Sequence, residues 1–126
     1  MGKFIVDGVA DGLVTLRTPG NNYRSAFKAP ATLPAAGEPV TGTIRATAWK
    51  IEAVSDGGNY VEPLIGRPRR MQGTVIAVNA GANELTVKTP YEVVVKLPEL
   101  HKASEFPVGS RVGFDNLEIP VFEPAA

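Results

Sequence analysis

Short runs in which apolar and polar residues alternate recur along the chain, and this period of two constrains the fold more than any other feature. Val14 and Leu16 alternate with polar neighbours in one run, and Leu85 and Val87 do so in another. Alternation places the apolar side chains on one face of a strand, whereas a helix needs spacings of three and four. Glycine, proline and Asp-Gly pairs separate the runs, as turns between strands require. The pattern predicts an all-β protein.

The two halves of the 126-residue chain resemble each other. The stretch 13–19 (LVTLRTP) parallels the stretch 84–90 (ELTVKTP), and an internal duplication explains the agreement. Halves of this size are marginally stable alone, so we expect them to pack on each other as two barrels or to interleave in one. The predicted organisation is a first β-barrel repeat over 1–58, a connector over 59–71 and a second repeat over 72–126.

Each half changes the phase of its alternation in its last segment. The apolar positions move from the even residues of 44–48 to the odd residues of 49–53, and from the even residues of 112–114 to the odd residues of 117–121. One extra residue exchanges the two faces of a strand, so each change predicts a bulge, a bend or a turn. A small barrel needs such a bend to close its sheet.

One segment has helical character. Residues 99–106 follow Pro98, a residue well suited to a first helical turn, whereas the counterpart 31–36 is interrupted by Pro34. Three strands, a short helix or loop and two more strands form the order of an OB-fold. We therefore expect two related OB-like small β-barrel halves that pack together, with at most one short helix.

The stretches 71–75 (MQGTV) and 108–112 (VGSRV) lie where each could begin a strand of the second half. This half resembles the duplicated oxyanion-binding modules of the molybdate-binding Mop type. In that family a strand beginning Leu-x-Gly-x-Val leads to a hairpin, a short helix and a final strand that contains glycine. The family's Ser-Ala-Arg-Asn stretch is replaced here by 67–70 (RPRR), and the first half has no Gly-x-Val at the matching strand. The resemblance implies the strand order of both halves and no ligand site.

Composition narrows the possible functions. Lys plus Arg and Asp plus Glu number 13 each, so no excess of basic residues marks a nucleic-acid-binding protein. The absence of cysteine excludes disulfides, thiolate catalysis and cysteine-based zinc sites. The chain shows no signal peptide and no stretch approaching the ~18 apolar residues of a membrane span. We expect a cytoplasmic protein that does not bind membranes.

Few residues could serve in catalysis or bind a metal. His101 is the only histidine, and no motif supplies a nucleophile or an orienting carboxylate for it. Asp7, Asp11 and Asp56 each precede glycine, which is typical of tight turns and not of a calcium loop. We therefore predict no catalytic residue, no metal site and no cofactor, and we do not expect an enzyme.

The candidate binding residues are cations in the connector and aromatic residues near them. Arg67, Arg69 and Arg70 stand within four residues and could clamp a phosphate or a carboxylate. Trp49 and Tyr60 could stack on a base, although packing would use the same rings. A solvated linker, or ion pairs with acidic residues of the chain, would explain the arginines equally well.

Two hypotheses on function follow from these residues. The first is a non-catalytic module that acts in protein–protein interaction or as a structural scaffold, and self-association is one form of it. The alternative is a binding module for single-stranded nucleic acid or a small anion, through the arginine-rich connector and the nearby aromatic residues.

Overall fold

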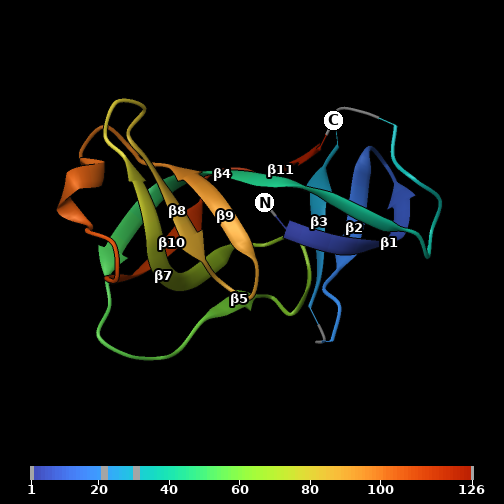
Figure 1. The fold of residues 1–126 in the computed structure, drawn as a ribbon, viewed down its shortest axis with the longest axis horizontal. Coiled ribbons are helices and arrows are strands. Elements are labelled where there is room, and N and C mark those ends of the chain that lie inside the picture. The colour runs from blue at the N-terminus through green and yellow to red at the C-terminus, as the bar shows by residue number, and fades with distance from the viewer. Residues whose placement is uncertain (1, 21–22, 30–31, 126) are drawn as a thin grey trace.

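The structure, a computed structural model, consists of strands and one short 3₁₀ helix, so the predicted all-β class is confirmed. It describes residues 2–20, 23–29 and 32–125. Figure 1 shows two groups of strands side by side along the long axis. The elements are β1 (Gly2–Ala10), β2 (Leu13–Arg17), β3 (Arg24–Lys28), β4 (Pro39–Ala53), β5 (Tyr60–Glu62), β6 (Ile65–Gly66), β7 (Arg70–Asn79), β8 (Glu84–Lys88), β9 (Glu92–Lys96), η1 (Ala103–Glu105), β10 (Arg111–Asn116) and β11 (Val121–Pro124).

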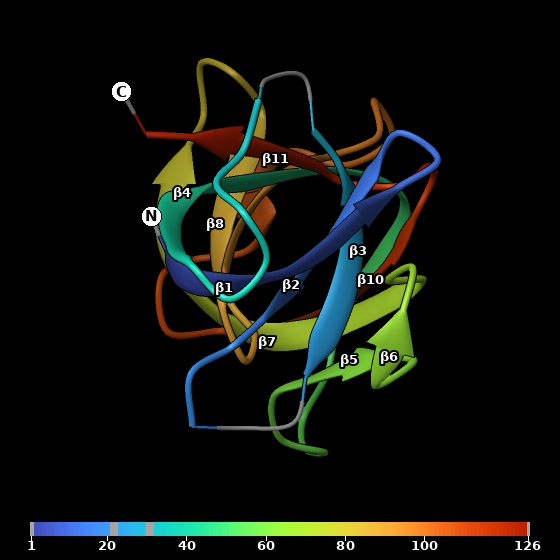
Figure 2. The ribbon, with the colours of Figure 1, turned by 90° about the vertical axis from the view of Figure 1, so that its right-hand side faces the viewer.

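Each group of strands closes into a ring. In the first ring β1 pairs with β2, β2 with β3, β3 with β11, β11 with β4 and β4 with β1. Figure 2 shows this ring facing the viewer. In the second ring β7 pairs with β8, β8 with β9, β9 with β4, β4 with β10 and β10 with β7. The strand β4 is therefore part of both rings.

The two rings exchange strands. Residues 39–42 of β4 pair with β1 in the first ring, whereas residues 44–53 pair with β9 and β10 in the second. In return β11, which follows β10 in the chain, pairs with β4 and β3 in the first ring. The strands of 1–58 and of 72–126 are thus interleaved. The predicted duplication itself stays a prediction, although the pairings of the two halves correspond.

The phase change in the first half is a β-bulge. Asp115 pairs with Lys50 and Asn116 pairs with Ala48, so Trp49 is an extra residue between them. Before this bulge the even residues 42–48 of β4 are buried, and after it Ile51 is buried, whereas Trp49 and Ala53 of the predicted odd face are exposed. The bulge lies in the portion of β4 that belongs to the second ring, where the pairing with β10 begins, and it turns the apolar side chains before and after it toward a core.

The phase change in the second half is a bend between β10 and β11, as one of the predicted alternatives required. The predicted apolar face was wrong, however. Leu117 is 63% exposed, and Pro120 and Phe122 are buried in place of the odd residues. The chain is irregular over 117–120, so alternation does not hold there and cannot assign faces.

The Asp-Gly pairs have different roles. Asp11 and Gly12 form the two-residue turn between β1 and β2, with positive φ angles of 54° and 77° that suit these residue types. Asp7 lies inside β1 at a bulge between Val6 and Gly8, so the expected turn there was wrong. An extra residue at the corresponding bulge of β7 is Ile76, between Val75 and Ala77.

The helix expected over 99–106 was also wrong in extent. Only Ala103–Glu105 is helical, as a single 3₁₀ turn. Prolines stand on both sides of the segment, and one turn is all that remains between irregular residues. The turn is fixed from outside, because the Ala103 N–H donates to Asn83 Oδ1 at 2.7 Å.

One hydrophobic core runs through both rings. Phe4 contacts Tyr91 edge-on at a ring distance of 5.6 Å and Phe122 at 5.9 Å, and Phe27 contacts Tyr91 at 5.9 Å. Tyr91 donates its hydroxyl to Ser25 Oγ at 2.9 Å. Because Tyr91 and Phe122 come from the second half of the chain, the core of the first ring needs both halves. No helix in the described part of the chain is long and apolar enough to cross a membrane.

Candidate binding groove

The connector lies against both rings. Its β5 pairs with β7 of the second ring, and its β6 pairs with β3 of the first. The Arg24 N–H donates to the Leu64 carbonyl at 3.1 Å, which ties the connector further to β3. The connector is therefore part of the sheet and not a tether.

Arg70 is held by carboxylates. Its Nη2 donates to Glu52 Oε1 at 2.5 Å, its Nη1 to Asp115 Oδ1 at 3.4 Å and its Nε to the Tyr60 hydroxyl at 3.4 Å. The guanidinium lies over Gly113, where a Cβ would collide with it. Burial alone would lower the pKa of Arg70, but the bonds and charges of these partners raise it on balance. Arg70 and Tyr60 therefore join strands β4, β5, β7 and β10 to one another.

Arg67 and Arg69 are exposed. Among the described residues neither forms an ion pair. Their backbone is nevertheless fixed: the Asn116 side-chain amide donates to the Pro68 carbonyl at 3.0 Å, and the Asn116 N–H donates to the Arg69 carbonyl at 2.9 Å. The structure thus separates the three predicted arginines into one with bound partners and two that face solvent.

Trp49 does not accompany the arginines. It is 57% exposed at the bulge of β4, and it lines neither of the hollows that contain Arg67. With Tyr60 bonded to Arg70, the predicted aromatic residues do not form a stacking platform beside Arg67 and Arg69.

Two hollows meet at Arg67 and form what we call the Arg67 groove. The first, of about 560 Å³, lies between the β1–β2 turn, the end of β3 and the start of β11. The second, of about 540 Å³, lies between the connector and the bend that follows β10. Both are lined by Arg67 and Ile119. The remaining lining residues are Asp11, Gly12, Leu13, Lys28, Ala29 and Val121 in the first hollow, and Pro63, Pro68, Arg69, Asn116, Leu117 and Glu118 in the second.

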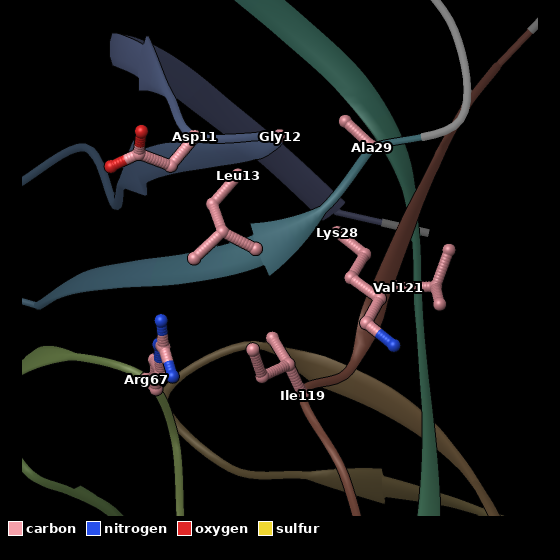
Figure 3. A pocket seen from close by; sticks show the side chains of 8 residues that line it. All are labelled: Asp11, Gly12, Leu13, Lys28, Ala29, Arg67, Ile119 and Val121. Carbon is pink, nitrogen blue, oxygen red and sulfur yellow. The ribbon is translucent and has the colours of Figure 1, made fainter.

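The first hollow has an aliphatic centre between two cations. In Figure 3 the side chains of Leu13 and Ile119 point toward each other, with Arg67 on one side of Ile119 and Lys28 on the other. Lys28, like Arg67, forms no ion pair within the described part of the chain. Such a surface can bind an anionic group and an apolar group side by side.

The second hollow contains an unpaired polar atom. Asn116 Oδ1 is buried, and no hydrogen bond reaches it. The side-chain nitrogen of the same residue is bound to the Pro68 carbonyl, which leaves the oxygen as a fixed acceptor. A buried acceptor without a donor is uncommon and costs free energy.

Sequence reasoning found Arg67 and Arg69 of this groove but missed Lys28, Asn116 and Ile119. The change of phase between 112–114 and 117–121 was the one signal available for the bend that carries Ile119. Lys28 and Asn116 are brought to the groove by the pairing of β3 with β11 and of β10 with β4, which no local pattern specifies.

A separate hollow contains His101. Its volume is about 400 Å³, and Ser104 lines it together with His101. His101 Nδ1 lies 3.1 Å from Glu105 Oε1. The hydrogen bond from the Lys102 N–H, and to a smaller extent the contact with His101, hold the pKa of Glu105 below its ordinary value. However, no hydrogen bond joins Ser104 to His101 within the described residues, so a nucleophile next to a base is lacking.

Among the described residues, no three His, Cys, Asp or Glu side chains gather in a way that could hold a metal ion. Comparisons with protein-family models, with curated proteins and with solved structures gave no match for this chain, so the OB-like and Mop-type resemblance stays a prediction.

Proposed function

We propose that the protein is a non-catalytic interaction module that binds a segment of a partner protein in the Arg67 groove. The observation that carries this proposal is the combination of an aliphatic floor with three cations that have no ion partner. Arginine is enriched at protein interfaces, and the buried core of an interface is more apolar than the rest of the surface. The groove is also built by residues of both rings, so its shape depends on the whole fold.

A second candidate, the binding of single-stranded nucleic acid or a small anion, is favoured by the same unpaired cations. It receives less support from the apolar part of the groove. Leu13, Leu117 and Ile119 are aliphatic and offer no flat ring for a base to stack on. Arg70 and Tyr60, which this function was expected to use, bind each other.

Selection from a random peptide library displayed on phage tests the proposal. Peptides enriched on the wild-type chain are compared on two charge reversals, Arg67→Glu in the groove and Lys88→Glu at an exposed site outside it. We expect enriched peptides that lose binding to R67E and keep binding to K88E.

If no peptide is enriched, or if the enriched peptides bind all three proteins equally, the groove is not a peptide-binding site. Fluorescence anisotropy with an oligothymidine tests the second candidate in parallel. Its affinity should then fall steeply with salt and depend on Arg67.

A further inference from the structure

We infer that the partner segment is an extended stretch in which every second residue is, in turn, acidic and aliphatic, so that both kinds of side chain lie on one face. This inference rests on the proposed function and specifies its ligand. It is carried by the order of charges in the Arg67 groove and by the aliphatic surface beside those charges.

The cations are separated by apolar residues. Ile119, with Leu13 opposite, lies between Lys28 and Arg67 in the first hollow (Figure 3). In the second hollow Pro63 and Leu117 line the surface that Arg67 and Arg69 share. The first hollow thus presents two cations with an aliphatic patch between them, and the second adds Arg69 together with Pro63 and Leu117. The complement of this surface is a chain with carboxylates on both sides of aliphatic side chains.

The acidic residues of the groove leave it with a net positive charge, so it still favours an acidic ligand. Asp11 and Glu118 line the groove together with Lys28, Arg67 and Arg69, so three cations face two acids and the net charge is +1. In Figure 3 the carboxylate of Asp11 is directed away from both Arg67 and Lys28. No ion pair joins these acids to the cations within the described residues. The cations stay available to a ligand.

An extended peptide matches the groove better than a fatty acid does. A fatty acid carries one carboxylate at one end of its apolar chain, whereas the groove presents three cations without an ion partner in the described part of the chain. A peptide can carry several carboxylates together with aliphatic side chains. Among anionic apolar ligands, the three cations therefore favour a peptide.

Fluorescence anisotropy with defined peptides tests the inference. The probe, called the Asp-Leu probe, is a labelled, N-acetylated peptide of three Asp-Ser-Leu-Ser repeats, which places Asp and Leu on the same face of an extended chain. Its controls replace each Leu with Ser, or each Asp with Lys. We expect the Leu-to-Ser control to bind at least about tenfold more weakly, because one buried leucine side chain alone accounts for that factor. The Asp-to-Lys control should not bind measurably.

Variants of the chain locate the binding. Arg67→Ala, Arg69→Ala and Lys28→Ala should each raise the Kd of the Asp-Leu probe by about two- to fivefold, the range of one exposed ion pair. Lys88→Ala removes an exposed cation outside the groove and should leave the Kd unchanged. Asn116→Asp keeps the side-chain shape and adds a charge next to the acidic probe, so it should weaken binding as well.

Three results would overturn the inference. They are an Asp-to-Lys control that binds as tightly as the probe, a K88A effect equal to that of R67A, and an octathymidine that binds more tightly than the probe with the same dependence on Arg67. If library peptides of another composition bind in a way that depends on Arg67, the proposed function stands and the alternating acidic ligand is rejected. If neither library nor probe binds, both are rejected.

Discussion

The three arginines of the connector, Arg67, Arg69 and Arg70, have different roles because their surroundings differ. Arg70 belongs to β7 and lies across the sheet, where Glu52 of β4 and Asp115 of β10 bind it. Arg67 and Arg69 precede that strand, and their side chains reach the groove between the rings. The basic run is therefore not one site, and substitutions of single arginines can distinguish their roles.

Arg70 should contribute to stability and Arg67 should not. Replacing Arg70 with alanine leaves two carboxylates without their counter-charge, so we expect the free energy of unfolding to fall by about 1–2 kcal/mol. Arg67→Ala removes an exposed side chain without an ion partner and should change it by less than about 0.5 kcal/mol. Urea denaturation at neutral pH measures both. Equal losses in the two variants would contradict these assignments.

Tyr91 should make stability fall at high pH. Burial raises the pKa of its hydroxyl above the ordinary 10.0, an effect that the bond to Ser25 reduces only in part. Above that pH the unfolded chain releases the proton and the folded chain keeps it, so unfolding is favoured by about 1.4 kcal/mol per pH unit until the folded pKa is reached. Below pH 10.0 the contribution of the neutral hydroxyl is fully present.

The variant Tyr91→Phe isolates this effect from the other groups that titrate there. It keeps the ring contacts with Phe4 and Phe27 but has no proton to lose. The unfolding free energy of the wild type minus that of Y91F should be constant up to about pH 9 and should fall above it, because only the wild type has this group to titrate. Chemical denaturation over this range tests the prediction, and parallel curves for the two proteins would refute it.

At this scale the sequence located the groove only in part. It identified the arginine run, because charge is visible in any sequence. It could not foresee that Glu52 and Asp115 bind Arg70, since that contact depends on the register of β10 with both β4 and β7. Alternation gives the face on which a side chain lies, but not the residues that neighbouring strands place beside it.

At the scale of elements, one extra residue in β4 keeps apolar side chains on the core face both before and after it. Because of the bulge at Trp49, the residues before it (Ile44, Ala46 and Ala48) and Ile51 after it all face the core. Without the extra residue, one of the two portions of β4 would present its polar face inward. The position of Trp49 in the chain therefore matters more than its side chain.

This argument separates two changes at the same residue. Trp49→Ala keeps the bulge and removes an exposed ring, so we expect a change in stability within about 0.5 kcal/mol. Deleting Trp49 shifts one portion of β4 by a residue and buries polar side chains, which should cost more than about 3 kcal/mol. Thermal and urea unfolding of both variants measure this. Comparable stabilities would show that the bulge is dispensable.

The elements themselves followed from the sequence more reliably than the connections. Strands were predicted correctly where apolar and polar residues alternate without interruption, as in β2 and β8. The expected helix shrank to η1, because local propensity over 99–106 is weak and prolines limit its length. The bend at 117–120 is irregular although its sequence alternates, and the Leu117 N–H donates to the Thr47 carbonyl of β4 at 2.7 Å, a contact that alternation does not indicate.

At the scale of the whole molecule, exchange of strands makes each ring depend on the other. The first ring obtains β11 from the second half of the chain, and the second ring obtains residues 44–53 of β4 from the first half. The sequence allowed two barrels or one interleaved barrel, since periodicity does not say which strands pair. Interleaving implies that neither ring can lose its structure while the other keeps its own.

A substitution in the first ring should therefore destabilise the second ring by the same amount. Phe122 is fully buried, and it reaches the first ring through β11. Phe122→Leu should lower the free energy of unfolding by about 1–2 kcal/mol. Native-state hydrogen exchange should show this loss at the slowest amides of β2 and, equally, at those of β8 and β10, because all of them exchange through one global opening.

Val9→Ala serves as the matched control, because Val9 is exposed in β1 of the same ring and its truncation should leave protection in both rings unchanged. If F122L lowered protection in β1–β3 while β8 and β10 kept theirs, the rings would open independently. The exchanged strands would then hold the halves together without coupling their stability. Loss of protection in both rings would establish a single cooperative unit, and the Arg67 groove, which both rings build, would exist only when the whole chain is folded.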